Sequence, residues 1–276
     1  MSNYLTIDVE DYYQVSAFEN IIAKDDWNSY PSRVVDNTRK ILSLLDANGV
    51  KATFFILGWT AGKHPELVRE ISGKGHEIGC HSFFHRLVYD LSPDEFREDT
   101  KQAKDILEQL TGRKVIGYRA PSYSVTSRSL WALDILAELG FEYDSSIFPI
   151  YHDRYGIPDA PRFSYRLPDR NLTEYPLSTS LFFGKKVPVA GGGYFRLFPY
   201  WFSRMALQRI NQKEGKPFIF YFHPWEIDPE QPRIKGASPL AFFRHHLNLT
   251  RTWNRLEKLL QDFAFIPLGT DRISSS

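Results

Sequence analysis

The sequence contains one cysteine, Cys80, among its 276 residues. A single cysteine excludes an intrachain disulfide and a zinc cluster built from cysteine thiolates. Charge of one sign is not in excess either, because 34 Lys and Arg stand against 33 Asp and Glu, for a formal net charge of +1. A chain this close to neutrality has no general field to attract nucleic acid or an anionic membrane, so neither partner is expected.

Long apolar runs are also missing, and no stretch approaches the length that a transmembrane helix needs. The first residues, MSNYLTIDVEDYY, lack the basic segment and following apolar stretch of a secretory signal. The sequence therefore predicts a cytoplasmic protein without a transmembrane segment.

What the chain does have is a globular composition that is rich in aromatic residues. Hydrophobic residues make up 42% of it and aromatic residues 15%, which argues against disorder. A chain of 276 residues can bury a large core, and α/β barrels of this length routinely form one domain. We therefore expect a single domain over residues 1–276.

Short apolar runs alternate with longer amphipathic ones along most of the chain. Strands are predicted at 4–9, 51–58, 76–81, 115–121, 143–147, 216–226 and 264–269. Helices are predicted at 33–49, 65–75, 92–112, 127–140, 201–215 and 242–263. This alternation is typical of an α/β fold with parallel strands, either a barrel or a doubly wound sheet. The segment from about 148 to 199 breaks the rhythm and is expected to be an inserted loop or small β-layer over the site.

Ligands of parallel α/β sheets bind at the carboxyl ends of the strands. Polar residues able to do chemistry follow several of the predicted strands at that end. They are Asp8, Glu10, Asp11, His81, His85, Arg119, Asp144 and His223. The sequence thus predicts that these side chains gather at one end of the sheet.

The stretch HSFFH places His81 and His85 four residues apart. In a helical turn, this spacing puts two side chains on one face, where they can converge on one ion. Two histidines at this spacing also arise by chance, so a carboxylate from elsewhere is needed to complete a metal site.

An acidic cluster at the end of the first predicted strand can supply that carboxylate. If strand geometry persists, Asp8 and Glu10 share one face, so one could bind metal while the other takes a proton from water. Two imidazoles and one carboxylate leave open positions on a Zn²⁺-type ion, as hydrolytic sites require. His223 could protonate a leaving amine, because the pKa of imidazole lies near neutrality.

Five stretches, TIDVED, HSFFH, RAPSYS, YDSSIFP and YFHPWE, occur in an order that resembles the motifs of NodB-type polysaccharide deacetylases, carbohydrate esterase family 4. The resemblance covers residues 4 to 226. It is closest to exopolysaccharide-locus and peptidoglycan deacetylases and to the allantoinase-like branch. The resemblance implies a distorted (β/α) barrel of about seven strands. The activity it implies is hydrolysis of the N-acetyl group of an amino sugar.

The resemblance also implies a role for each matching residue. Asp8 would be the general base and His223 the general acid, while Arg119 would orient the base and Asp144 would support His223. The implied metal ligands and substrate-binding residues are His81, His85, Pro121, Tyr123, Phe222 and Trp225.

One departure concerns the third metal ligand. The family motif has two adjacent aspartates, the second of which binds metal, whereas Val9 here separates Asp8 from Glu10 and Asp11. Strand alternation favours Glu10, and Asp11 stays open as the alternative. The ligand set predicts one divalent cation, Zn²⁺ first and Co²⁺ or Ni²⁺ as alternatives.

The expected activity is N-deacetylation of an N-acetylated oligo- or polysaccharide or its precursor. Two alternatives stay open at this point: hydrolysis of a cyclic amide or ureide, and a catalytically silent carbohydrate-binding barrel. The glycine run in GGGYFRLFP predicts either a substrate loop or a tight turn. His245 and His246 lie in a basic predicted helix and are expected to face solvent, and no role is assigned to them.

Overall fold

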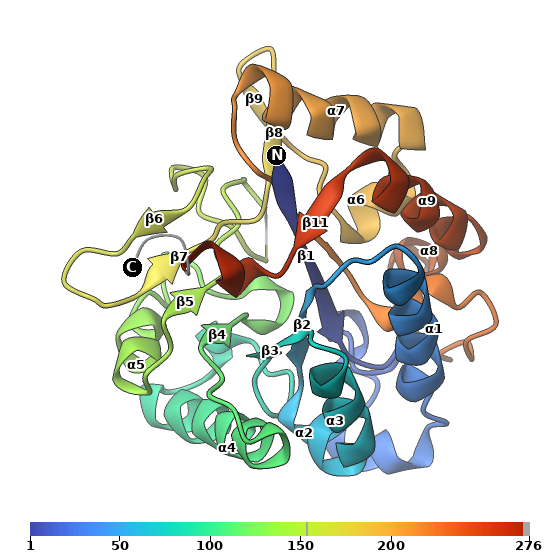
Figure 1. The fold of residues 1–276 in the computed structure, drawn as a ribbon. Helices are drawn as coiled ribbons and strands as arrows, with labels where there is room; N and C mark the ends of the chain where they lie inside the picture. The colour runs from blue at the N-terminus through green and yellow to red at the C-terminus, as the bar shows by residue number, and fades with distance from the viewer. Residues whose placement is uncertain (153, 273–276) are drawn as a thin grey trace.

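The computed structural model describes residues 1–152 and 154–272 (Figure 1). Its strands are β1 Ser2–Val9, β2 Thr53–Ile56, β3 Glu77–Cys80, β4 Gly117–Tyr118, β5 Tyr143–Asp144, β6 Tyr165–Arg166, β7 Thr173–Glu174, β8 Thr179–Phe182, β9 Lys185–Pro188, β10 Ile219–Phe222 and β11 Ala264–Ile266. Its α-helices are α1 Val34–Ala47, α2 Gly58–Lys63, α3 Pro65–Gly73, α4 Pro93–Thr111, α5 Ala132–Glu138, α6 Gly192–Leu197, α7 Tyr200–Lys213, α8 Pro239–His246 and α9 Leu249–Asp262.

A curled sheet of nine strands organises the molecule, in the order β10-β1-β2-β3-β4-β5-β7-β6, with β11 also paired to β1. Its ladders are parallel except for the one between β6 and β7. Figure 1 shows α1, α3, α4 and α5 arranged along the outside of the sheet. The predicted α/β class and distorted barrel are therefore confirmed, with a sheet that is open between β10 and β6 in the described part of the chain.

The elements begin and end where local chemistry dictates. Helix α4 starts at a capping box, in which the Ser92 hydroxyl accepts from the Glu95 amide and the Glu95 carboxylate accepts from the Ser92 amide. It ends at Gly112, whose φ of 65° lies in the left-handed region that glycine adopts without strain. Strand residues Ile7, Phe54 and Cys80 are buried in the main core, as a sheet covered by helices requires.

The prediction of a single helix over 242–263 is wrong, because the helix is interrupted between α8 and α9. Asn248 there has a φ of 54°, and its side-chain amide donates to the backbone carbonyl of Arg196. The guanidinium of Arg196 donates in turn to the carbonyls of Arg244, His245 and Leu247. These are carbonyls at the end of α8 that a helix terminus leaves unpaired, so a buried arginine from a distant part of the chain satisfies them.

The segment 148–199 contributes more than a loop. Strand β7 joins the main sheet beside β5, whereas β8 and β9 form a separate hairpin. Helix α6 lies near the end of this segment, and its first residue, Gly192, lies against Tyr221 of β10. In the described residues, no helix has both the length and the apolar character that crossing a membrane demands.

Candidate active site

A cavity of about 710 Å³ lies at the carboxyl ends of the parallel strands. Seven of the residues proposed from the sequence line it: Asp8, Glu10, His81, His85, Tyr123, His223 and Trp225. Arg119 lies beneath this lining, fully buried. The convergence expected from parallel-strand geometry is thus present in the structure.

Glu10, His81 and His85 form a buried triad whose ligand-type atoms all lie within 4.8 Å of one another. Oε2 of Glu10 is 2.7 Å from Nε2 of His85. A carboxylate oxygen and an imidazole nitrogen this close require a proton or a cation between them. Burial would raise the pKa of Glu10, but the imidazoles of His85, His223 and His81 outweigh it and hold that pKa below its ordinary value.

His81 is arranged as a neutral ligand. Its Nδ1 lies 2.8 Å from the backbone carbonyl oxygen of Arg119. Since a carbonyl only accepts hydrogen bonds, Nδ1 carries the proton and Nε2 keeps a lone pair. Burial lowers the pKa of His81 to about 4, which favours the neutral ring. The triad therefore fits a divalent cation bound through two imidazoles and one carboxylate.

The loop that carries the two histidines is not the helical turn that their spacing suggested. Ser82 and His85 have φ values of 63° and 54°, and the His85 amide donates to the Ser82 hydroxyl. The amides of Phe83 and Phe84 both donate to the carboxylate of Asp99 on α4. A buried carboxylate that the sequence did not single out thus holds the loop in shape.

Asp11, the alternative third ligand, has a different position. Its carboxylate accepts from the amides of Arg33 and Val34 and from the Ser32 hydroxyl, at the start of α1. These contacts are those of a side chain that satisfies free amides at a helix N-terminus. Of the two candidates, the structure places Glu10 beside the histidines.

Asp8 is held by Arg119, the residue for which the resemblance implied this contact. Nη1 of Arg119 donates to Oδ1 of Asp8 at 2.8 Å and to the Thr6 hydroxyl at 2.7 Å. Its Nε and Nη2 donate to the backbone and the hydroxyl of Ser145. The guanidinium thus fixes one carboxylate oxygen of Asp8, while Oδ2 lies 3.9 Å from Nε2 of His223.

Asp144 does not lie against His223 as implied. It packs against Glu174 on β7, and it accepts from the Ser146 hydroxyl at 2.5 Å. Ser146 in turn accepts from the amide of Ala120. The YDSS stretch therefore holds the loop of Arg119 through its two serines, because strand β5 lies beside β4.

Glu226, rather than Asp144, contacts the ring of His223. Its Oε2 lies 3.3 Å from Nδ1 of His223, and its Oε1 accepts from Nε of Arg196. Burial alone would lower the pKa of His223, but the carboxylates of Glu10, Glu226 and Asp8 raise it to about 9. A protonated His223 facing the cavity is thus stabilised by three carboxylates.

Strand alternation separates the residues of β10 into two sets. Tyr221 and the residue that follows the strand, His223, line the cavity, whereas Phe222 packs in the main core, so the predicted substrate contact of Phe222 is wrong. Pro121 is buried and lies outside the cavity lining, whereas Tyr123 lines the cavity. Ser122 and Tyr123 have φ values of 50° and 54°, a strained backbone next to the site.

Trp225 links the site to α8. Its indole Nε1 donates to Oε1 of Glu10, and its ring stacks on His223 at a centroid distance of 5.2 Å. The ring of His245 also stacks on Trp225, at a centroid distance of 4.2 Å, and its Nε2 forms a hydrogen bond with Oε1 of Gln231. The expectation that His245 faces solvent is wrong, because it is buried in this aromatic stack.

The glycine run 191–193 serves a close backbone approach. Gly191 has a φ of 137°, and a Cβ there would lie 1.9 Å from the carbonyl oxygen of Tyr221. Gly192 and Gly193 line the cavity. The run is therefore both a tight backbone contact with β10 and part of the cavity wall.

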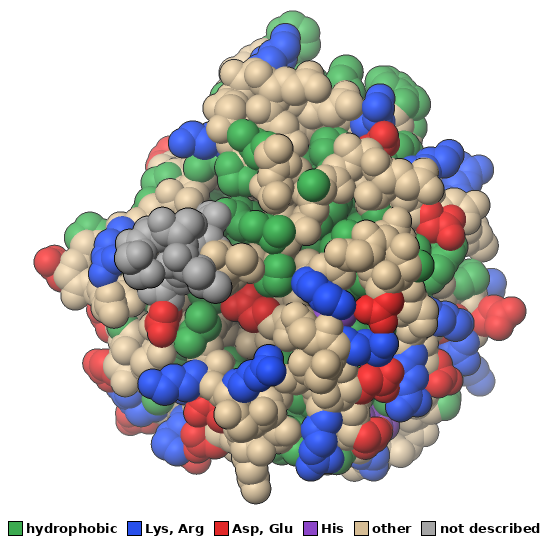
Figure 2. All heavy atoms as spheres, viewed as in Figure 1, with side chains coloured by type: hydrophobic (Ala, Val, Ile, Leu, Met, Phe, Trp, Pro, Cys, Tyr) green, Lys and Arg blue, Asp and Glu red, His purple; other side chains and the backbone are tan. Residues whose placement is uncertain are grey.

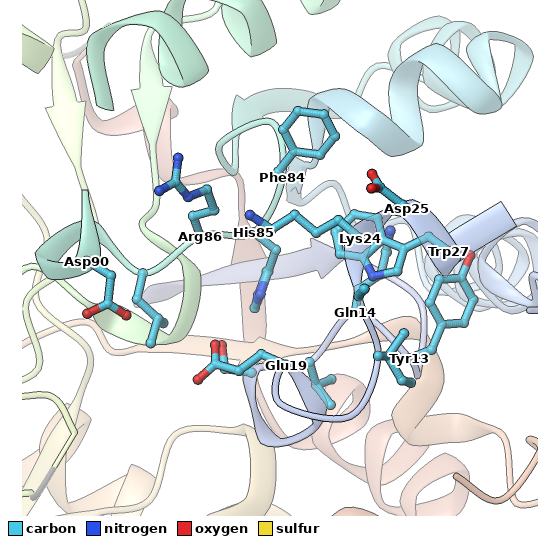
Figure 3. A pocket seen from close by; sticks show the side chains of 15 residues that line it. Tyr13, Gln14, Glu19, Lys24, Asp25, Trp27, Phe84, His85, Arg86 and Asp90 are labelled. Carbon is cyan, nitrogen blue, oxygen red and sulfur yellow. The ribbon is translucent and has the colours of Figure 1, made fainter. Parts of the chain in front are cut away.

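A second pocket of about 460 Å³ adjoins the cavity and shares Val15, Ser16, His85 and Leu87 with it. Figure 3 shows the Lys24 side chain beside Trp27 and Phe84, with Glu19 and Asp90 lower in the same view. This combination of aromatic rings with charged groups of both signs suits a polar ligand that also presents an apolar face.

Comparison with known proteins relates this site to a family. Residues 24–143 match the model of a family described as polysaccharide deacetylase. A peptidoglycan-N-acetylglucosamine deacetylase of Bacillus cereus is 37% identical over 98 residues, which are 35% of this chain and 36% of the relative. Residues 24–143, which are less than half of the chain, are thus similar to the polysaccharide deacetylase family.

Other comparisons agree in part. The peptidoglycan-N-acetylmuramic acid deacetylase PdaA of Bacillus subtilis is 29% identical over 105 residues, 38% of this chain and 39% of that protein. The matched region thus spans less than half of either relative. A solved structure of a candidate polysaccharide deacetylase from Mycobacterium smegmatis superposes with a TM-score of 0.59 at 22% identity, over 96% of this chain and 86% of that one, and so shares the fold.

The polysaccharide deacetylase match does not contain the whole site. Residues 145–270 match a separate model, described as a domain of unknown function (DUF3473). His223, Glu226 and Arg196 lie in that second segment, whereas His81, His85 and Arg119 lie in the first. The cavity is therefore assembled from both matched segments together with β1.

Proposed function

We propose that this chain is a metal-dependent hydrolase that removes N-acetyl groups from N-acetylhexosamine units of a polysaccharide or its precursor. The observation that carries the proposal is the placement of Asp8 and His223 in one cavity with the triad of Glu10, His81 and His85. A base, an acid and a cation-binding triad in one cavity are the parts that metal-assisted amide hydrolysis needs.

A divalent cation at the triad would polarise the acetyl carbonyl and lower the pKa of the attacking water. Asp8 would take the proton from that water. Arg119 binds its Oδ1, whereas its Oδ2 lies on the side of His223 and is the oxygen that would accept the proton. His223 would donate a proton to the amide nitrogen as the C–N bond breaks, and its pKa of about 9 keeps it charged for this role near neutral pH. Acetate and a free amine are the products.

We propose Zn²⁺ as the cation, with Co²⁺ or Ni²⁺ as substitutes, because two histidines and one carboxylate are a common donor set of hydrolytic zinc. The substrate class follows from the named relatives, which are deacetylases of N-acetylated peptidoglycan sugars. We further propose that a neighbouring sugar of the chain occupies the second pocket, which is continuous with the cavity through shared lining residues.

The test is release of acetate from N-acetylglucosamine oligomers and from peptidoglycan fragments, after removal of metal and reloading with Zn²⁺, Co²⁺ or Ni²⁺. We expect activity only with metal, about one equivalent of metal per chain, and loss of both in His81→Ala. Asp8→Asn is expected to retain metal but to lose roughly 10²–10⁴-fold in kcat, the usual contribution of a general base.

The same assay separates the alternatives. Turnover of a cyclic ureide such as allantoin without acetate release from sugars would replace the proposal with the second reaction. Saturable oligosaccharide binding without turnover in any metal form would indicate a binding barrel. Wild-type protein that turns over N-acetylated sugars after complete metal removal would contradict the role given to the triad.

A further inference from the structure

An exposed aromatic and basic surface lies outside the cavity lining, at the β8–β9 hairpin, the end of α6 and helix α7. Four large apolar side chains protrude there: Phe183, Leu197, Trp201 and Met205. Figure 2 shows hydrophobic side chains with Lys and Arg among them at the end of the molecule where these elements lie. We call these four residues, together with Lys185 and Arg209, the hairpin surface.

Phe183 is the most exposed of the four, with a relative accessibility of 105%. It sits at the tip of the hairpin with a φ of 49°, followed by Gly184 with a φ of 76°. Two successive residues with positive φ are the pattern of a turn that asparagine and glycine favour. A phenylalanine in this conformation is strained and contacts solvent, so neither the turn nor the core explains it.

Two of the other exposed apolar side chains lie on α7. Trp201 is 66% exposed and Met205 43%, and their spacing of four residues puts them on one helical face. Phe202 stacks on Phe182 of β8 at 5.4 Å, which fixes the helix against the hairpin. The protruding residues are thus mounted on a packed base.

Charge on this part of the chain is of one sign. The net charge of +1 conceals an uneven distribution, because residues 175–213 contain Lys185, Lys186, Arg196, Arg204, Arg209 and Lys213 and no acidic residue. Arg196 is buried in its pair with Glu226, and Arg204 pairs with Asp262 of α9. Lys185 and Lys213 are exposed, and the guanidinium of Arg209 lies over the ring of Phe182.

We propose that the hairpin surface docks the protein onto an anionic lipid bilayer. Exposed Trp and Phe side chains favour the interface between lipid headgroups and acyl chains, and basic residues beside them are attracted to anionic headgroups. A protruding, fully exposed phenylalanine beside lysine fits insertion into a fluid interface. The absence of acidic residues over 175–213 supplies the charge complementarity.

The surface is connected to the cavity by one short helix. Gly192 at the start of α6 lines the cavity, and Leu197 at its end belongs to the hairpin surface. A helix of six residues spans about 9 Å. Docking would therefore keep the cavity close to the membrane, where a lipid-linked or wall-attached sugar chain is met.

The test is co-sedimentation of the purified chain with vesicles of phosphatidylcholine alone or mixed with phosphatidylglycerol. We expect binding to the anionic vesicles that weakens with salt, and a loss of roughly tenfold or more in Phe183→Asn and in Trp201→Ala. Phe183→Asn removes the apolar side chain without disturbing the fold, because asparagine before Gly184 suits this turn. Leu130→Ser, which changes an exposed leucine elsewhere, is the matched control and should bind like wild type.

Failure of wild type to bind anionic vesicles at low salt would overturn the proposal, as would equal binding by Phe183→Asn. Self-association that Phe183→Asn abolishes, without vesicle binding, would assign the surface to a second copy of the chain instead. Acetate release from soluble oligosaccharides should be unchanged in Phe183→Asn, so the outcome is independent of the proposed reaction.

Discussion

Glu226 contacts His223 with one carboxylate oxygen and Arg196 with the other, at 3.3 Å and 2.7 Å. The three side chains form a chain of contacts that starts at the cavity and ends at the carbonyls of α8 to which Arg196 donates. Burial would raise the pKa of Glu226, but Arg196 and His223 lower it to about 2, so Glu226 is an anion near neutral pH, where His223 is charged. The orientation and charge of His223 therefore depend on Glu226 of the same motif and, through it, on Arg196, which lies outside the motif.

Replacement of Glu226 by Gln is expected to lower kcat more than it changes KM. Glu226 raises the pKa of His223, so its loss lowers that pKa, and the alkaline limb of kcat/KM should move to lower pH. The loss in rate should remain smaller than the roughly 10²–10⁴-fold loss of His223→Ala. A pH–rate profile checks this, with thermal unfolding measured in parallel because Arg196 loses an ionic partner.

Glu230→Gln is the matched control, because it removes a carboxylate from the same loop at an exposed position. An unmoved alkaline limb in Glu226→Gln, with normal folding, would show that Glu226 does not tune His223.

The third metal ligand can be decided by a pair of substitutions. Glu10→Gln is expected to lose the bound metal, since Glu10 lies with both histidines. Asp11→Asn should retain metal but lower the free energy of unfolding by about 1 kcal/mol, because Asp11 satisfies the free amides of α1. Elemental analysis and thermal unfolding of both variants are the measurements, and metal loss in Asp11→Asn alone would reverse the assignment.

Much of this site follows from the sequence because parallel strands end on the same side of a sheet. Asp8, His81 and His223 could be predicted to meet for this reason. Phe222 could have been excluded by the same reasoning, because alternation along a strand sends it to the face opposite His223. Glu226 carried a usable signal as well, since it stands three residues after His223, the spacing of a capping box.

Arg196 and the break at Asn248 carried no comparable signal. The role of Arg196 and the helix break both depend on a contact between distant segments, because Arg196 and Arg244 are 48 residues apart in the sequence. Periodicity over 242–263 predicted a continuous helix because it records local preference alone. A buried guanidinium that binds carbonyls is a tertiary event, and such events override local propensity.

The buried pair of Asp144 and Glu174 predicts a dependence of stability on pH. Burial raises the pKa of Asp144, and burial together with the charge of Asp144 raises that of Glu174 well above its ordinary value. A carboxyl whose folded pKa is raised stabilises the fold fully below its unfolded pKa, and the contribution is lost as pH rises through the folded pKa. The free energy of unfolding should therefore fall as pH rises through the titration of the pair.

Glu174→Gln should flatten that fall, because an amide reproduces the protonated carboxyl and can still accept from the Ile147 amide. Denaturant unfolding across the pH range measures the effect, and Asp169→Asn on an exposed loop is the control. The same slope in Glu174→Gln as in wild type would mean that the pair is not protonated in the folded protein.

Two neighbouring glycines provide the last prediction, which tests how β10 is positioned. A Cβ on Gly191 would lie 1.9 Å from the Tyr221 carbonyl oxygen, and the φ of 137° disfavours any side chain. A Cβ on Gly193 would have Nη2 of Arg196 as its nearest neighbour, 3.9 Å away. Gly191→Ala should therefore destabilise the fold by about 3 kcal/mol or more and displace His223, whereas Gly193→Ala should fold normally. Thermal unfolding and acetate release measured on both variants check this, and equal stability of the two would show that the contact between Gly191 and Tyr221 does not position the strand.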